Sequence, residues 1–254
     1  MNKLREMLKN GKKIKGTLAC LTDPAICEIF GNVGFDCVWI DMEHSYMSTK
    51  DVLCHLNAAK STDMCSLVRV PQDDLTFIKK VMELGPDAML FPFVQTKEEV
   101  EKLIKYTLYP PEGTRGFGPM RAIKYGGLDA KEYSKNQSFD MLRFVQIESK
   151  NLIDELSEIV KNPYIDGFIF GPNDLSGSIN EFLDVFGENT VNEINRAMKI
   201  IKESGKYSGL AGGFDEKTIK FWSQFDFDML FAGGDWNYIF DAGKRTLGLL
   251  EDNY

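Results

Sequence analysis

Short apolar runs rich in β-branched and aromatic residues alternate along the chain with longer segments whose apolar positions recur at helical spacing. Ile194, Met198 and Ile201 illustrate the second pattern, in which one helical face packs against a sheet. The apolar runs predict eight strands: Ile14 to Cys20, Phe35 to Asp41, Ser66 to Val70, Ala88 to Phe93, Leu142 to Ile147, Gly167 to Phe170, Tyr207 to Ala211 and Asp228 to Phe231.

The ends of several predicted helices carry recognisable signals. A Thr followed three residues later by Glu forms a capping box, and a glycine after the last periodic residue ends a helix. These signals are Thr96 with Glu99, Thr190 with Glu193, Gly85 and Gly205. They favour helices that alternate with the predicted strands.

Eight strand and helix units in 254 residues, with no linker between them, predict one α/β domain over residues 1–254, a (β/α)8 TIM barrel. An open Rossmann sheet would show a glycine-rich turn after its first strand, whereas the chain has Leu21 to Pro24 there. The stretch Tyr109 to Asn136 exceeds a minimal barrel and is typical of a lid or an interface element.

Composition excludes several classes of partner. The 30 Lys and Arg against 38 Asp and Glu give a net charge of −8, which disfavours binding to nucleic acid or an anionic membrane. No apolar run reaches the roughly 18 to 20 residues of a membrane-spanning helix. The cysteines form no C-x-x-C pair, so we expect reduced packing residues in a cytoplasmic protein. They are Cys20, Cys27, Cys37, Cys54 and Cys65.

Ionisable and polar residues gather where the predicted strands end. In a barrel of parallel strands the carboxyl ends share one rim, which carries the catalytic groups. The residues at this rim are Asp41, Glu43, His44, Arg69, Gln146, Glu148, Gly171, Asn173 and Asp174. Their convergence predicts an active site at this rim.

Glu148 and Asp174 follow adjacent predicted strands, so their carboxylates can bind a hard divalent cation through oxygen. Two protein carboxylates that leave coordination positions open describe a catalytic metal site. The alternative is that Asp174 only caps the helix that begins near Leu175. The pairing with Glu148 favours the metal.

His44 lies beside Asp41 and Glu43, where a carboxylate orients the ring, and this suits a general base near neutral pH. His55 falls within a predicted helix, which favours a structural role. Arg69 ends an apolar strand and requires an anionic partner, either a substrate or a structural carboxylate. No lysine occupies a predicted strand end at this rim, which argues against Schiff-base chemistry.

Six segments resemble the HpcH/HpaI aldolase family, metal-dependent pyruvate aldolases that act on 4-hydroxy-2-oxo acids and 2-keto-3-deoxy sugar acids. The match covers nearly the whole chain. The segments are Gly34 to Asp36, Asp41 to His44, Arg69 to Pro71, Tyr109 to Gly116, Val145 to Ser149 and Gly171 to Ser176.

The resemblance implies roles for the rim residues in cleavage to pyruvate and an aldehyde through a pyruvate enolate. Glu148 and Asp174 would hold Mg²⁺, Mn²⁺ or Co²⁺. His44 would be the base, with Asp41 and Glu43 beside it, and Arg69 would stabilise the enolate oxygen. Pyruvate would be held by Gln146, Gly171, Asp174 and the backbone at Asn173.

The resemblance also implies a homo-oligomer, with trimers paired into hexamers. Glu83 would reach the histidine of a neighbouring subunit, although by spacing alone it is a solvated helix residue. Pro86 stands where the family more often has alanine, so we expect the contact between Glu83 and the neighbouring histidine to be altered. The segment from Trp236 onward carries more apolar surface than a terminal helix on a closed barrel requires, which predicts a subunit interface.

Two alternatives to the aldolase remain. An acyl-CoA ester lyase of the citrate-lyase-β-like group shares the barrel and the carboxylate pair, but the D-x-E-H sequence favours free-acid aldolases. A catalytically inactive barrel that serves as an assembly subunit is disfavoured by the intact ionisable set. The glycine-rich segments at 208–213 and 232–235 favour close packing, with a phosphate site as the alternative.

Overall fold

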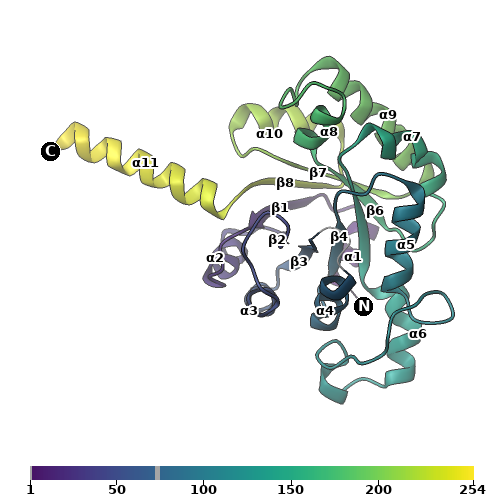
Figure 1. Ribbon diagram of the computed structural model, residues 1–254. Coiled ribbons are helices and arrows are strands. Elements are labelled where there is room, and N and C mark those ends of the chain that lie inside the picture. Colours follow the sequence, from purple (N-terminus) through teal and green to yellow (C-terminus); the bar gives the residue numbers. More distant parts are fainter. Residues whose placement is uncertain (1, 72–74) are drawn as a thin grey trace.

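Eight parallel strands close into a barrel in chain order, with β1 paired to β8 (Figure 1). This computed structural model describes residues 2–71 and 75–254, without the side chains of 137–139. The predicted (β/α)8 barrel is confirmed. The strands are β1 (Ile14–Ala19), β2 (Cys37–Asp41), β3 (Cys65–Arg69), β4 (Ala88–Phe91), β5 (Leu142–Ile147), β6 (Gly167–Phe170), β7 (Tyr207–Gly212) and β8 (Met229–Gly234).

Helices surround the barrel and connect its strands (Figure 1). They are α1 (Lys3–Lys9), α2 (Ala25–Val33), α3 (Thr49–Ser61), α4 (Leu75–Leu84), α5 (Lys97–Thr107), α6 (Ala130–Asp140), α7 (Lys150–Ile159), α8 (Pro172–Ser178), α9 (Glu188–Ser204), α10 (Glu216–Trp222) and α11 (Asp235–Asn253), with 3-10 turns η1 (Lys124–Gly126) and η2 (Ser223–Phe225). No helix of the described chain is long and apolar enough to cross a membrane.

One of the two predicted capping boxes is correct. Thr96 caps α5 and exchanges hydrogen bonds with Glu99, as predicted. The box at Thr190 is wrong, because α9 already begins at Glu188 with Gly187 as its N-cap. The Thr190 hydroxyl instead donates to the carbonyl of Asp184, 3.0 Å away, and so closes the preceding turn. Thr190 and Glu193 have the spacing of a capping box, but the helix already begins two residues before Thr190.

Side chains on alternate strand positions fill the barrel interior. Trp39 and Phe231 meet edge to face inside it, with ring centroids 5.4 Å apart. A Cβ atom at Gly16 would lie 2.3 Å from the Phe231 ring, so only glycine leaves room for that ring. At the amino ends of the strands, Leu4 and Leu8 of α1 close the interior.

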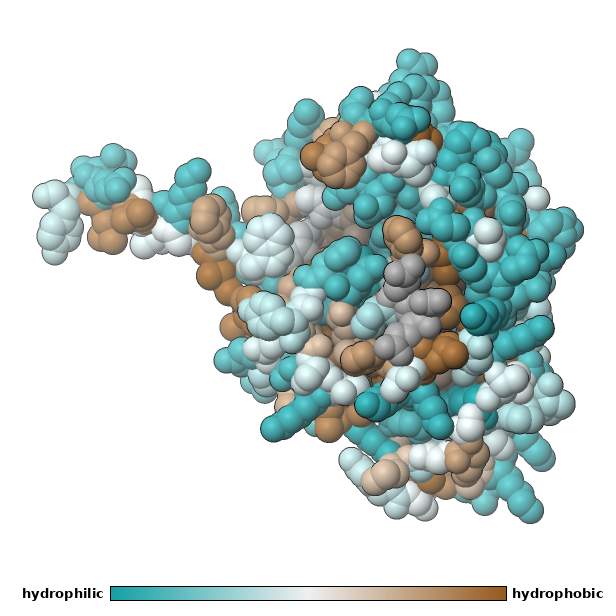
Figure 2. All heavy atoms as spheres, in the orientation of Figure 1, coloured by the Kyte–Doolittle hydropathy of each residue, from teal (hydrophilic) through white to brown (hydrophobic). Residues whose placement is uncertain are grey.

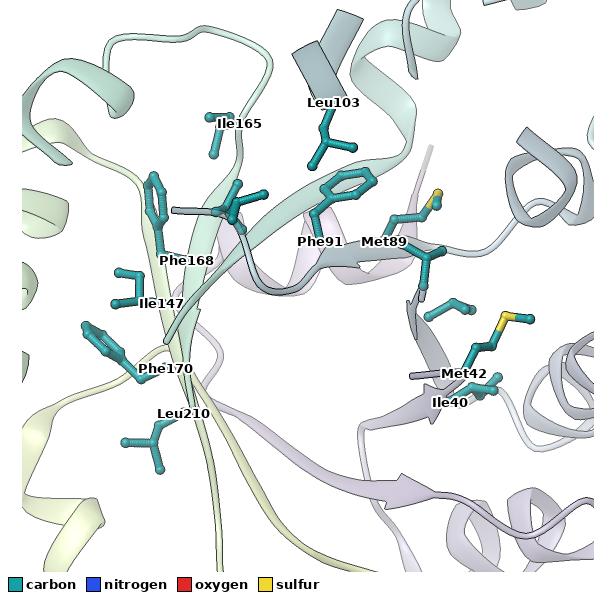
Figure 3. Packing of buried hydrophobic residues seen from close by; sticks show 14 of the residues in the cluster. Ile40, Met42, Met89, Phe91, Leu103, Ile147, Ile165, Phe168, Phe170 and Leu210 are labelled. Carbon is teal, nitrogen blue, oxygen red and sulfur yellow. The ribbon is translucent and has the colours of Figure 1, made fainter. Parts of the chain in front are cut away.

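The other strand face packs against the helices and forms the larger core. Figure 3 shows part of it, where Phe91 of β4 lies near Leu103 of α5. With both faces buried, β2 through β6 are buried at every position. Alternate residues of a strand point to the same side, so the residue two positions after an inward one also points inward. The inward positions Trp39, Leu67 and Phe144 are followed in this way by Asp41, Arg69 and Gln146.

The terminal helix α11 extends away from the barrel rather than along it (Figure 1). Apolar side chains stand out on this arm in Figure 2. Those that are at least half exposed are Trp236, Ile239, Phe240, Leu247, Leu249 and Leu250. The excess of apolar surface predicted for this segment is present.

Candidate active site at the carboxyl rim of the barrel

Asp41 and Arg69 end neighbouring strands in register and form a buried ion pair. The Arg69 Nε donates to Asp41 Oδ1 at 2.9 Å, and its Nη2 donates to Oδ2 at 2.5 Å. Asp41 Oδ1 also accepts from the backbone N–H of Glu43 at 2.9 Å. Asp41 therefore holds both the guanidinium and the start of the loop that carries His44.

Glu43 links this pair to His44. Its Oε2 lies 2.9 Å from Arg69 Nη1 and 3.7 Å from His44 Nε2. Burial raises the pKa of Glu43, and the carboxylates of Asp41 and Asp174 add to the shift while Arg69 opposes it. The His44 ring itself is mostly exposed. It thus has the carboxylate neighbour expected from the sequence and access to a substrate above the barrel.

Glu148 lies directly after β5 and is only 6 % exposed. Its Oε2 accepts a hydrogen bond of 2.9 Å from the backbone N–H of Phe93 in the loop after β4. Burial raises the pKa of Glu148 to about 7, and the charges of Glu43 and Asp174 also raise it, whereas the Phe93 amide and Arg69 lower it. Phe93 was missed from the sequence, because a backbone amide carries no residue signal.

Gly171 allows Glu148 and Gln146 to occupy adjacent positions. A Cβ at Gly171 would lie 2.9 Å from both Cγ and Oε1 of Glu148, and 3.0 Å from Gln146 Nε2. Gln146 is 3 % exposed, and its Oε1 has no hydrogen-bond partner within the described chain. A buried amide oxygen without a partner is costly, so this atom is prepared for a donor or a cation from outside the chain.

Asn173 and Asp174 lie in the first turn of α8, and both are exposed at the rim. Gly171 is the N-cap of this helix, and among the described residues no side chain caps it. The helix-capping alternative for Asp174 is therefore not what the structure has. Asp174 instead acts electrostatically on both Glu43 and Glu148.

The charge balance of the rim fits a divalent cation. Asp41, Glu43 and Glu148 bring three carboxyl groups near the Arg69 guanidinium, and Asp174 lies close enough to act on Glu43 and Glu148. Within the described residues no three His, Cys, Asp or Glu side chains are arranged to hold a metal. Glu148 and Asp174 as two oxygen donors, with other positions left to substrate and water, suit Mg²⁺ or a similar hard ion. The residues present fit the predicted group.

Glu83 lies elsewhere. It is near the end of α4, which leads into the amino end of β4, and its Oε1 accepts from Arg115 Nη2 at 2.8 Å. The Arg115 guanidinium is buried over the ring of Tyr109, 4.5 Å from its centroid. Glu83 Oε2 is also covered and has no hydrogen-bond partner among the described residues. The structure does not group Glu83 with the rim residues of the same chain.

The glycine-rich ends of β7 and β8 border a hollow of about 340 Å³ beside the site. Asn173, Leu18 and Trp236 form other parts of its wall. These glycines therefore leave space at the mouth as well as permitting close packing. The sequence did not indicate this hollow, because its walls come from six separate segments of the chain.

Comparison with known proteins decides the family. The model of the HpcH/HpaI aldolase/citrate lyase family matches residues 17–215. The chain belongs to this family. It is 32 % identical over 212 residues to a hydroxypyruvate/pyruvate aldolase of Roseobacter denitrificans, covering 83 % of this chain and 82 % of that protein. A 5-keto-4-deoxy-D-glucarate aldolase of Escherichia coli is 30 % identical over 209 residues, covering 82 % and 81 %.

A solved HpcH/HpaI aldolase from Desulfitobacterium hafniense shares the fold with a TM-score of 0.91, at 22 % identity over 99 % of this chain and 97 % of that one. The resemblance noted from the sequence is thereby confirmed. The chain is an aldolase of the HpcH/HpaI family and thus a carbon–carbon lyase. Members of the family generally depend on a divalent metal.

The buried Glu148 of this HpcH/HpaI aldolase predicts a pH dependence of stability. The folded metal-free protein binds a proton at Glu148 up to about pH 7, whereas an unfolded glutamate releases it near 4.5. Protonated Glu148 therefore contributes roughly 3 kcal/mol to the free energy of unfolding below pH 4.5. This contribution declines as the pH rises above 4.5 and is lost once the pH has passed 7. Urea unfolding from pH 5 to 8 should show this loss in the wild type relative to E148Q, and parallel curves would contradict it.

Proposed function

We propose that this enzyme is a divalent-metal-dependent aldolase that cleaves 4-hydroxy-2-oxo acids of the 2-keto-3-deoxy type into pyruvate and an aldehyde. The observation that carries the proposal is the buried Glu148 carboxyl beside the exposed Asp174 and the Gln146 oxygen, which no described residue partners. A divalent cation supplies the positive charge that these acceptor oxygens lack. The two aldolase relatives support this substrate class.

Glu148 and Asp174 would hold the cation in our proposal, which we take to be Mg²⁺, Mn²⁺ or Co²⁺. When bound, such a cation supplies the positive charge that stabilises negative charge developing on the 2-oxo oxygen of the substrate. Gly171 keeps this position open, since any side chain there would displace the Glu148 carboxylate. The Phe93 amide fixes the other oxygen of Glu148.

The proton transfer falls to His44 in this proposal. Its exposed ring can accept the proton of the 4-hydroxyl group of the substrate, and Glu43 stabilises the charged ring from 3.7 Å. Arg69 donates two hydrogen bonds to Asp41 and forms an ion pair with Glu43, so the fork is fixed in place before substrate arrives. From this position Arg69 stabilises the enolate oxygen.

Pyruvate would be bound by Gln146, Gly171 and the first turn of α8 at Asn173. The start of a helix presents backbone N–H groups, which suit the pyruvate carboxylate. A panel of aldehydes offered with pyruvate and several divalent ions tests the proposal. Formation of 4-hydroxy-2-oxo acids is expected. Activity only on acyl-CoA esters would instead support the citrate-lyase-β-like alternative, and the absence of any turnover would support a non-catalytic barrel.

We further propose that the aldolase is a cytoplasmic homo-oligomer, a trimer or hexamer, built through α11. All five cysteines are free, as suits a reducing compartment. An apolar groove of about 550 Å³ lies between α2, α10 and the start of α11, where a helix following β8 normally packs. Because α11 projects outward, the α11 of a second copy is the expected occupant (Figures 1 and 2). In such an oligomer Glu83 would reach a partner's His44, for which it would first have to break its ion pair with Arg115.

Disrupting the arm should therefore dissociate the enzyme. Deleting residues from Trp236 onward is expected to give smaller, less stable particles with low activity, because the apolar groove of each copy loses the α11 that would occupy it. Light scattering at micromolar concentration measures the particle size, with the exposed substitution Asp252→Ser as the control. An active, intact monomer of the full chain would contradict the assembly.

A further inference from the structure

The loop between β1 and α2, residues 20–24, borders the site but contributes nothing to the chemistry described so far. The Cys20 thiol lies close enough to Asp41, Asp235 and Arg69 for their charges to act on it. Leu18, just before the loop, forms part of the wall of the hollow at the mouth. The loop thus lies between the ion pair of β2 and β3 and the hollow.

Asp235 holds this loop from the side of α11. It is 1 % exposed, and its Oδ2 accepts hydrogen bonds of 2.8 Å from the backbone N–H groups of both Cys20 and Leu21. Its Oδ1 accepts a third from Trp236 N–H, also at 2.8 Å. A buried carboxylate with three amide donors is strongly fixed, because each such bond is charge-assisted. Asp235 therefore joins the loop to Trp236, whose side chain lines the hollow.

His55 holds the same loop from α3. The ring is fully buried, with Nε2 2.9 Å from the carbonyl oxygen of Leu21 and Nδ1 2.8 Å from that of Asp51. A carbonyl oxygen only accepts, so the tautomer that carries its proton on Nε2 donates a hydrogen bond to Leu21. Leu21 is thus fixed through its N–H by Asp235 and through its C=O by His55.

We propose that Asp235 and His55 are positioning residues that set the aldehyde-binding side of the mouth. This inference rests on the proposed function. The residues proposed for pyruvate, Gln146, Gly171 and Asn173, come from β5, β6 and α8. The clamped loop follows β1, which pairs with β8 and lies on the other side of the closed barrel from β5, so its position shapes the space for the second substrate.

The variants D235N and H55Q test this inference, with D241N as the matched control. Asp241 is an exposed residue of the same helix α11. Because a hydrogen bond to a charged group contributes about one to two powers of ten in an equilibrium, amide exchange of the 19–26 segment should accelerate roughly tenfold or more in D235N and H55Q. Hydrogen exchange with mass spectrometry measures it, and circular dichroism checks folding.

Kinetics separate the two substrates. In deuterated water, loss of pyruvate methyl protons reports enolate formation without an aldehyde. We expect this exchange to change less than twofold in D235N and H55Q, while KM for the aldehyde in the addition reaction rises about tenfold. D241N should match the wild type in every assay.

Each outcome has a defined meaning. Unchanged loop exchange in both variants overturns the positioning role. A freed loop with an unchanged aldehyde KM, or an equal loss of pyruvate proton exchange, overturns the role in aldehyde binding. Failure of the wild type to exchange pyruvate protons would contradict the proposed function instead, and the amide-exchange result would still decide whether the two residues clamp the loop.

Discussion

Replacing Glu148 with glutamine is expected to abolish divalent-metal binding and to reduce aldol cleavage to background while the barrel remains folded. Glutamine keeps the volume and can still accept from the Phe93 amide, but it lacks the charge that a cation needs. Isothermal titration with Mn²⁺ measures the binding, and far-ultraviolet circular dichroism checks the fold.

The matched control is Glu158→Gln, which makes the same change at an exposed position of α7. It should bind metal and turn over like the wild type. Metal binding by E148Q with wild-type affinity would remove Glu148 as a ligand. Because Glu148 and Asp174 are the only protein ligands proposed, affinity should be modest, and a chelator should inactivate the wild type reversibly.

The second large effect is expected at His44. Substitution by alanine should lower kcat by about a hundredfold or more, the usual scale for loss of a general base. The ring is mostly exposed and lies 3.7 Å from Glu43, so its removal should leave the fold and the binding of pyruvate largely unchanged. Steady-state cleavage and pyruvate titration measure the two quantities separately. An unchanged kcat in H44A would exclude His44 from the mechanism.

The strand order and the rim could be predicted from the sequence because one physical pattern determines both. The apolar run of β5 predicted Leu142 to Ile147, and the structure has the same bounds. Polar residues placed after such runs must lie at the carboxyl rim, which put Asp41, Arg69, Gln146 and Glu148 together. Boundaries shifted where the last residues are small, as at β8, which continues to Gly234 rather than ending at Phe231.

Contacts made by backbone atoms and by distant loops could not be predicted. The Phe93 amide reaches Glu148 only because β4 and β5 are neighbours in the closed barrel. Likewise, Asp235 and Cys20 are separated by most of the chain and meet because β8 pairs with β1. His55 was correctly predicted to be structural, but its carbonyl partner Leu21 depends on how α2 and α3 pack.

Glu83 shows the limit of a resemblance. The family match gave it a role at a partner's histidine, and the spacing gave it a solvated position. The structure has a third arrangement, in which Glu83 pairs with the buried Arg115 of the long insertion. Its reach into a neighbouring subunit remains a prediction, since it depends on an assembly that a single chain does not display.

The requirement for a divalent cation is tested most directly by the release of pyruvate from 4-hydroxy-2-oxo acids by enzyme stripped of metal with a chelator, before and after Mg²⁺ or Mn²⁺ is restored. We expect pyruvate release only with the cation restored, and none from E148Q under either condition. Full turnover by thoroughly demetallated wild type, or turnover by E148Q, would contradict it.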